Sequence, residues 1–228
     1  DGGVKLGCRR NSEGVPYLSS QRFSPPVHLS KPYFDQETSS LLINLSCPTA
    51  GLLAGDRMVC DIEVCDQASM VVTTPGATRS HFMRSGIARV EQRFRIKEGA
   101  FLEFNPGALI LQKATNLQQV TEVEVDEDAE VLFVEKILPG RIAHGESFVF
   151  QKFSNQLRIK QENQIVLSES FILDPENETI LPWKNSFPTP YYGSFYLISK
   201  KLKEDLPSRE MIHRMNSQNL LTGATSLH

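Results

Sequence analysis

Apolar and polar residues alternate along most of this chain. In 58–65, for example, Cys60, Ile62 and Val64 share one phase of the alternation, and Asp61 and Glu63 share the other. Such a pattern predicts strands that bury one face and expose the other. The same period of two runs through 89–96, 119–125, 129–137, 155–161 and 164–173, and 41–47 reads as one more compact strand.

The two ends of the chain follow different patterns. Prolines at positions 16, 25, 26 and 32 interrupt residues 1–40. Because proline cannot donate a backbone hydrogen bond, this region is expected to form short edge strands and turns. A helical pattern is found only after Pro207, where 208–215 predict one short helix. The chain is therefore expected to be mainly β.

Three segments repeat the same order of features: an acidic turn, a small residue, an apolar strand and Pro-Gly. Ala68, Ala100 and Ala129 occupy the same place in each, 32 and then 29 residues apart. This spacing predicts stacked β-layers, although chance similarity between β-turns would give the same pattern. We expect a single domain over 1–228, built as a layered β-sandwich or a β-solenoid-like stack of short strands with one or two short helices.

Composition and charge narrow the class of protein. A net charge of −3 without a cluster of Lys and Arg argues against binding to nucleic acid or to a membrane surface. No apolar run reaches the length of a membrane span, and no signal peptide is visible. The four cysteines form no C-x-x-C pair, and Cys60 lies in the apolar phase of its strand. A buried thiol and a cytoplasmic location are therefore expected.

A glycine-rich turn precedes the first strictly alternating strand. Gly51 and Gly55 lead directly to Asp56. Glycine is used where a backbone turns tightly or takes a positive φ. The turn therefore predicts that the carboxylate of Asp56 is held in one place.

Three further carboxylates lie among apolar residues. Glu135 and Glu169 each share a strand phase with apolar side chains, and Glu103 lies inside the run Ala-Phe-Leu-Glu-Phe. Burial of a lone carboxylate is costly or forces it to take up a proton. Each of these acids is therefore expected to have a partner, a hydrated cavity or a cation beside it.

Two interpretations of these acids remain open. Arginines such as Arg57 or Arg141 could neutralise them in structural ion pairs. Alternatively, the acids form a polar seam through the core together with Asp56. Because hard oxygen ligands bind divalent transition ions more weakly than thiolate or imidazole, such a seam would suit the passage of an ion better than its storage.

Four motifs follow one another in the chain. The first is the turn at 48–57, and the second is TTPGATRSHFMRSG at 73–86. The third is GAFLEFNP at 99–106, and the fourth is EKILPGRIAHGESF at 135–148. In this order they resemble the urease accessory protein family UreD, also called UreH, with similarity from about 26 to 173 and again at 221–228.

The chain departs from the family pattern at several positions. Thr49-Ala50 and Ala54-Gly55 stand in place of two glycine pairs, Arg79 replaces a lysine, and Phe82 replaces a tyrosine. Members of the family continue with a further strand and a C-terminal helix, which this chain is expected to lack.

The resemblance implies a mainly β accessory protein, not an enzyme, that takes part in the maturation of the nickel enzyme urease. It implies binding to apo-urease, to UreF and to the GTPase UreG, and transient passage of nickel through an internal channel without a tightly bound cofactor. Asp56, Glu135 and Glu169 match acids associated with that channel, and Glu103 is added because of its apolar neighbours. The motifs also imply structural turns at Gly51, Gly55, Gly76, Gly140 and Arg141.

Two alternatives to the nickel conduit are weighed. One is an interaction scaffold without metal passage, in which arginines neutralise the acids. The other is a β-solenoid that acts on carbohydrate, since paired carboxylates can serve as acid and base. The second is disfavoured because the chain has no aromatic stripe for sugar stacking, and no nucleophile elbow, P-loop or zinc signature.

Overall fold

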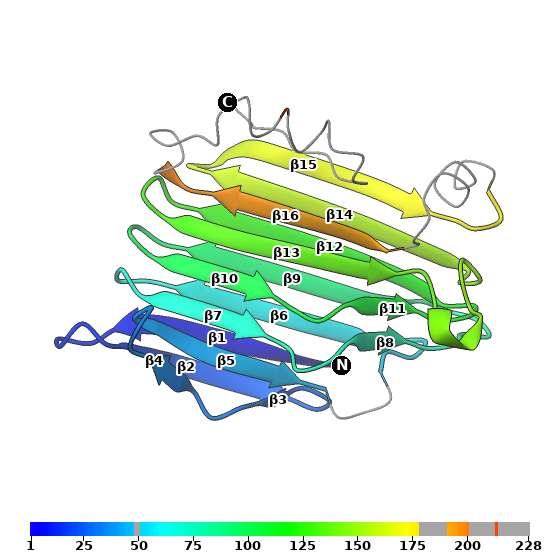
Figure 1. Ribbon diagram of the computed structural model, residues 1–228, viewed down its shortest axis with the longest axis horizontal. Helices are drawn as coiled ribbons and strands as arrows, with labels where there is room; N and C mark the ends of the chain where they lie inside the picture. Colours follow the sequence, from blue (N-terminus) through cyan, green and yellow to red (C-terminus); the bar gives the residue numbers. More distant parts are fainter. Residues whose placement is uncertain (48–50, 178–190, 201–212, 214–228) are drawn as a thin grey trace.

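The computed structural model describes residues 1–47, 51–177, 191–200 and 213, and shows two β-sheets lying face to face (Figure 1). In spatial order the seven-stranded sheet contains β15 (Gln164–Leu173), β14 (Lys152–Gln161), β12 (Asn116–Val125), β9 (Ala88–Ile96), β6 (Arg57–Val64), β1 (Gly2–Arg10) and β2 (Pro16–Ser24). The nine-stranded sheet contains β3 (His28–Leu29), β5 (Ser40–Ser46), β7 (Ser69–Thr73), β10 (Phe101–Asn105), β13 (Glu130–Leu138), β11 (Leu109–Leu111) and β8 (Thr78–Ser80), with β16 (Tyr192–Ile198) on β13 and β4 (Tyr33–Asp35) on β5.

Successive strands alternate between the two sheets, so the chain winds as a solenoid. From β6 onward the path alternates between the sheets through β7, β9, β10, β12, β13 and β14, and the short strands β8 and β11 follow β7 and β10 within the nine-stranded sheet. Neighbouring strands of the winding are parallel, as expected when each turn repeats the one before. Antiparallel strands are added at the margins, where β15 pairs with β14 and β16 pairs with β13. The expectation of a mainly β, solenoid-like fold is confirmed.

The repeated alanines mark the corners of this solenoid. Ala68, Ala100 and Ala129 are at most 1% exposed. The backbone N–H of Phe101 donates to the carbonyl of Ala68, and that of Glu130 donates to the carbonyl of Ala100, both at 2.9 Å. The three corners therefore stack directly on one another, and the sequence repeat reflects this stacking instead of chance similarity between turns.

The space between the sheets is filled by side chains from the apolar phase of each strand. Phe94, Phe104 and Phe133 meet at its centre, with ring centroids 4.6 to 5.7 Å apart. All three are at most 4% exposed. Such aromatic contacts add stability beyond the area they bury, and they tie β9 of one sheet to β10 and β13 of the other.

The outer face of the seven-stranded sheet carries charges in register. One row crosses five strands and alternates in sign: Lys5, Asp61, Arg93, Glu122 and Arg158. Opposite charges on adjacent strands stabilise a sheet, whereas like charges directly opposite destabilise it. The alternating Arg and Glu residues of β9 are thus explained by the strands on either side of it.

The N-terminal region matches its expectation in part. The strands β2, β3 and β4 lie at sheet edges, and β3 and β4 are only two and three residues long. β1 and β2 are each nine residues long, and β1 lies inside its sheet between β6 and β2. A Cβ atom on Gly3 would lie 2.2 Å from the carbonyl oxygen of Val59, so only glycine allows β6 to approach this closely. Glycines that allow this close packing interrupt the alternation of apolar and polar side chains, so β1 could not be recognised from the sequence. Pro16 is the first residue of β2, a position where proline is tolerated.

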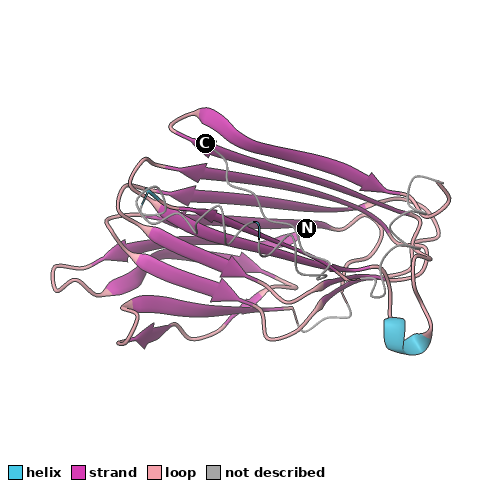
Figure 2. Cartoon of the chain, turned by 45° about the horizontal axis from the view of Figure 1, so that its top comes forward, coloured by secondary structure: helices cyan, strands magenta, loops and turns pink. Residues whose placement is uncertain are grey.

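Helix contributes little to the described residues. The 3₁₀ turn η1 (Ile142–His144) lies at the right-hand end of the molecule in Figure 2. The helix expected at 208–215 falls outside the described residues, apart from His213, which is helical. No helix in the described part of the chain is long and apolar enough to cross a membrane.

The stacked corners make a first prediction. Ala100→Leu forces three extra carbon atoms between two neighbouring turns, and overpacking of this kind costs about 1–3 kcal/mol. We expect a lower urea midpoint in an unfolding titration followed by circular dichroism. Ala77→Leu, at an exposed position, is the matched control and should leave the midpoint unchanged. Equal midpoints for the two variants would contradict the stacking of alanines at the corners.

Candidate functional site

Glu135 lies in the core between the two sheets. It is 5% exposed and shares the inward face of β13 with Phe133 and Ile137. This phase follows from the period of two along β13, which also buries Val131, although Val134 in the other phase is buried as well. A carboxyl group is thus held where the sequence would otherwise place an apolar side chain.

Only uncharged groups hydrogen-bond to Glu135 among the described residues. The Gln119 amide on β12 donates to Oε1 at 2.8 Å, and the Asn155 amide on β14 lies 3.3 Å from both carboxylate oxygens. Burial raises the pKa of Glu135 from its ordinary 4.5 to about 7, even though the Asn155 and Gln119 amides act to lower it. The negative charge of Glu169 adds to the increase. A group poised in this way exchanges a proton near neutral pH.

Glu169 is the second carboxylate of the site. It is half-buried on β15 and faces inward. The Tyr192 hydroxyl on β16 donates to Glu169 Oε1 at 3.3 Å. The pKa of Tyr192 is raised by its burial first and by Glu169 second, with a smaller contribution from Glu135. Two acids and one tyrosine from three strands therefore share one electrostatic environment.

Two buried hydroxyls beside the acids have unused hydrogen-bonding capacity. Ser194 Oγ and the Tyr196 hydroxyl find no hydrogen-bond partner in the described part of the chain. Ser194 lies opposite Glu135 in the register of β13 and β16. Its hydroxyl is near enough to influence the pKa of Glu135 but lacks the directed geometry of a hydrogen bond. Buried polar groups in this condition indicate a place for water or an ion.

A break in the nine-stranded sheet opens beside Glu135. β10 pairs with β13 as far as Phe104 opposite Phe133, and pairing resumes with β11 at Leu109 opposite Ile137. A cavity of about 40 Å³ lies at this break and includes Glu135 in its lining. Its other walls are formed by Gln92, Phe104, Pro106, Gly107, Leu109, Gln119, Phe133, Val134, Lys136 and Ile137. Water needs only about 10–15 Å³ of such space, so the cavity can be hydrated.

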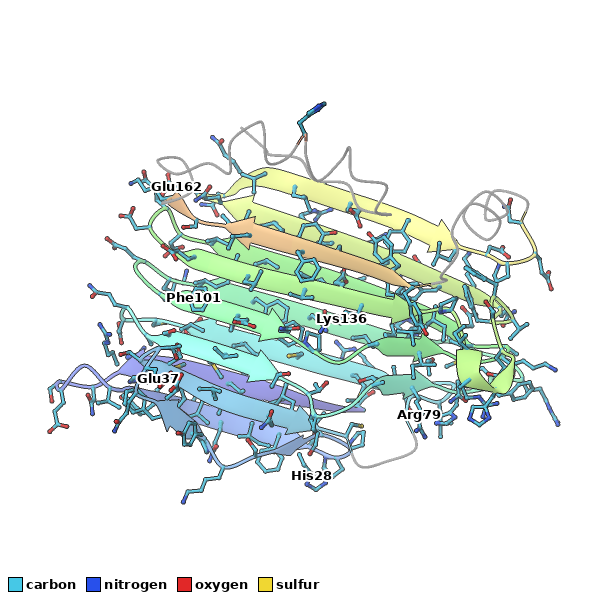
Figure 3. The ribbon with its side chains drawn as sticks, viewed as in Figure 1. His28, Glu37, Arg79, Phe101, Lys136 and Glu162 are labelled. Carbon is cyan, nitrogen blue, oxygen red and sulfur yellow. The ribbon has the colours of Figure 1, made fainter. Side chains whose placement is uncertain are left out.

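Lys136 stands at the outer side of this break (Figure 3). Its Nζ donates to Asn105 Oδ1 at 2.7 Å and to the carbonyl of Pro106 at 3.1 Å. Asn105 in turn donates its amide to Glu103 at 3.1 Å. Glu103 alternates with buried Leu102 and Phe104, so it lies on the outer face of the sheet and outside the interior pair.

Asp56 occupies a different part of the molecule. Its carboxylate accepts the backbone N–H of Leu53 at 2.8 Å and so closes its own turn. β6, which follows Asp56, is separated from β15 by β9, β12 and β14. At about 4.8 Å per strand this amounts to roughly 19 Å across the sheet. The structure therefore brings Glu135 and Glu169 together but not Asp56.

The arginines considered as neutralising partners are engaged elsewhere. Arg57 makes two hydrogen bonds to Glu91 at 2.7 and 2.8 Å. Arg141 pairs with Glu146, five residues further along the same loop. No ion pair to Glu135 or Glu169 is found within the described ranges.

The predicted structural turns have steric reasons. Gly51 has a φ of 132°, and a Cβ there would lie 2.2 Å from the carbonyl oxygen of Arg79. Gly140 has a φ of 153°, and its Cβ would lie 2.5 Å from the carbonyl oxygen of Glu146. Gly55 has a positive φ of 86° but open space around it, and Gly76 offers its carbonyl as the close neighbour of Gly107.

Sequence reasoning missed the groups that surround the carboxylates. Gln119 and Asn155 are buried polar residues in the inward phase of their strands, so the test that singled out Glu135 could have found them. Tyr192, Ser194 and Tyr196 follow the last strand recognised from the sequence. The described residues contain no group of three His, Cys, Asp or Glu side chains placed to hold a metal ion, so the pair of acids offers a partial site.

Comparison with known proteins places the chain in a family. The model of the UreD urease accessory protein family matches residues 1–228. The urease accessory protein UreD of Opitutus terrae is 36% identical over 168 residues, 74% of this chain and 62% of that protein. UreH of Helicobacter hepaticus is 27% identical over 75% of this chain and 68% of its own length. UreD of Actinobacillus pleuropneumoniae serotype 5b is 25% identical over 98% of this chain and 85% of its own length.

These comparisons agree with the motifs found in the sequence. The chain spans somewhat less than two thirds of the Opitutus terrae relative, and more of the other two. A family of accessory proteins also agrees with the expectation that the chain is not an enzyme. With a match over its whole length, the chain belongs to the UreD family of urease accessory proteins.

Proposed function

We propose that this protein acts in the maturation of urease in the cytoplasm, where it binds apo-urease together with UreF and the GTPase UreG and passes Ni²⁺ toward the urease active site. Family membership supports the role in maturation. The observation that carries the passage of nickel is the pair of buried Glu135 and half-buried Glu169, which has no cationic partner among the described residues.

The chemistry of this pair suits a moving ion. Two carboxylates supply hard oxygen ligands, which hold a divalent transition ion less tightly than thiolate or imidazole would. The hydroxyls of Tyr192, Ser194 and Tyr196 lie around them, and water can complete the coordination. Ni²⁺ would displace the proton that burial favours on Glu135 and would be released again by reprotonation.

The break between β10 and β11 supports a route to the pair. The cavity there connects the lining residue Glu135 with Pro106 and Lys136 at the outer side. Glu103 lies on that outer side, linked to Lys136 through Asn105. We assign Glu103 to the mouth of the route and Glu135 with Glu169 to its interior. Asp56, whose carboxylate closes its own turn, has a structural role in this proposal.

A scaffold without metal passage is the second candidate. It requires the interior acids to be neutralised, and the arginines that could do so pair with Glu91 and Glu146 instead. This arrangement favours the conduit over the scaffold.

The nickel route predicts a separation of activation from assembly. In Glu135→Gln/Glu169→Gln, amides replace both oxygen ligands with little change in volume, and we expect nickel-dependent activation of urease to fall by about tenfold or more. The complex with apo-urease and UreF should still form in a co-purification assay. Glu122→Gln, on the outer face of β12, is the matched control. Full activation by the double variant would refute the conduit and leave the scaffold.

Burial of Glu135 makes a prediction about pH and stability. With a pKa of about 7 when folded and 4.5 otherwise, the folded protein binds more protons than the unfolded chain between these values. The free energy of unfolding therefore falls as pH rises through this range and levels off above about pH 7, by a total of about 3 kcal/mol from this group. Urea titrations of wild type and Glu135→Gln from pH 4.5 to 8 measure the difference.

The variant has no carboxyl group at this position, so the gap in unfolding free energy between it and wild type should change with pH. A constant gap across the range would show that Glu135 titrates normally and is not desolvated.

A further inference from the structure

Several of the motif loops meet at one end of the solenoid. The backbone N–H of Leu52 donates to the carbonyl of Arg79 at 2.8 Å. That of Met83 donates to Ala114 at 3.3 Å, and that of Ala114 donates to Val149 at 2.8 Å. The loops 51–56, 79–87, 112–115 and 139–151 therefore form one continuous layer, at the right-hand end of Figure 1 beside β8 and β11.

Three large apolar side chains point outward from this layer. Leu53 is 51% exposed, Phe82 is 58% exposed and Val149 is 42% exposed. Each stands next to a buried neighbour: Leu52, Met83 and Phe148 pack in a second apolar cluster beneath the layer. The loops are already stabilised by the apolar cluster beneath them, so the exposed Leu53, Phe82 and Val149 add little to folding. These side chains are therefore available to contact another molecule.

The loops that carry Leu53 and Val149 are held by side-chain contacts of their own. The Asp56 carboxylate holds the backbone N–H of Leu53 at 2.8 Å. The loop that carries Val149 is closed by the ion pair of Arg141 and Glu146. Exposed apolar groups on rigid loops bind with little loss of conformational entropy.

The charges around the apolar side chains are mostly positive. Arg79, Arg84 and Lys113 are exposed, and no acidic side chain pairs with them among the residues described. Glu146 is engaged with Arg141. The turns at the opposite end of the solenoid carry both signs of charge, since Asp66 pairs with Arg9, Asp126 pairs with Lys97, and Glu127 and Asp128 pair with Lys200. Figure 3 labels Arg79 at one end and Glu37 and Glu162 at the other.

We propose that the surface formed by Leu53, Phe82 and Val149 with Arg79, Arg84 and Lys113, here called the Phe82 end, docks an acidic protein surface that carries an exposed apolar residue. A small apolar centre inside a charged rim is the usual arrangement of a protein interface. The positive rim selects an acidic partner and speeds the encounter. The proposal rests on the proposed function, since it names the chemistry of one contact in the maturation complex.

Protein is favoured over nucleic acid as the occupant. A protein domain that binds nucleic acid usually has a strong excess of basic residues, whereas this chain has a net charge of −3. The centre of the Phe82 end is aliphatic as well as aromatic, which suits side chains of a partner better than phosphate groups.

The test measures binding of the wild-type chain and two variants to purified apo-urease and, separately, to purified UreF–UreG. Phe82→Asp and Arg84→Glu/Lys113→Glu should each weaken binding to one of these partners by about tenfold. Binding of wild type to that partner should also weaken as salt is raised from 50 to about 500 mM. Tyr33→Asp and Lys31→Glu are the matched controls because Tyr33 is 66% exposed and Lys31 is exposed, near β4 at the other end of Figure 1. Circular dichroism confirms that all variants fold.

Several outcomes overturn the proposal. Unchanged binding of both partners by Phe82→Asp and by the double variant would refute the Phe82 end while leaving the proposed function in place. A wild-type chain that binds neither partner would refute both. A wild-type dimer in sedimentation that Phe82→Asp converts to a monomer would make a second copy the occupant. Loss of binding to a fluorescent DNA duplex, with protein binding intact, would make it a nucleic-acid surface.

Discussion

Backbone hydrogen bonds between successive turns of the solenoid fix how the side chains of its strands line up across the two sheets. Because parallel neighbours are in register, residues at equivalent places in each turn form rows across the sheets. One row holds the corner alanines, and another holds the alternating charges from Lys5 to Arg158. A substitution in one turn is therefore expected to affect the turns on both sides, and a large side chain at a corner is expected to disturb the packing.

The same register explains how a polar site survives in an apolar core. Gln119, Asn155 and Glu135 come from β12, β14 and β13, and all three point inward. Gln92 and Thr121 continue the polar row toward β9, joined by a hydrogen bond of 2.9 Å. Amides satisfy a carboxylate without neutralising it, so the charge stays available to a proton or a cation. An arginine in the same place would have closed the site.

Strands and their buried faces could be predicted from the sequence, because alternation within a strand is a local property. The phase of Glu135 and the alanine repeat were both recognised in this way. The hydrogen bonds to Glu135 could not be predicted. Gln119 and Asn155 lie 16 and 20 residues from Glu135 in the chain, and they meet it only because the chain winds as a solenoid. The face of the sheet on which Glu103 lies was predicted wrongly. Phe101, in the same phase of β10, is apolar as well, so both faces of the strand were expected to be buried. β1 was not recognised because its glycines, which allow close packing against a neighbouring strand, interrupt the alternation of apolar and polar side chains.

The motif residues divide into two groups with different physical roles. Glu135 and Glu169 lie in the body of the solenoid, where desolvation raises the pKa of Glu135. Gly51, Gly55, Asp56 and Arg141 lie at one end, where each shapes a loop instead of contacting the acids. In the sequence, an aspartate in a glycine-rich turn suggests a metal ligand. In the structure, a carboxylate oxygen of Asp56 accepts the backbone N–H of Leu53. A sequence motif thus marks a position with a demanding local geometry. The surroundings of that position in the structure are needed to separate a residue that could contact an ion from one that shapes a loop.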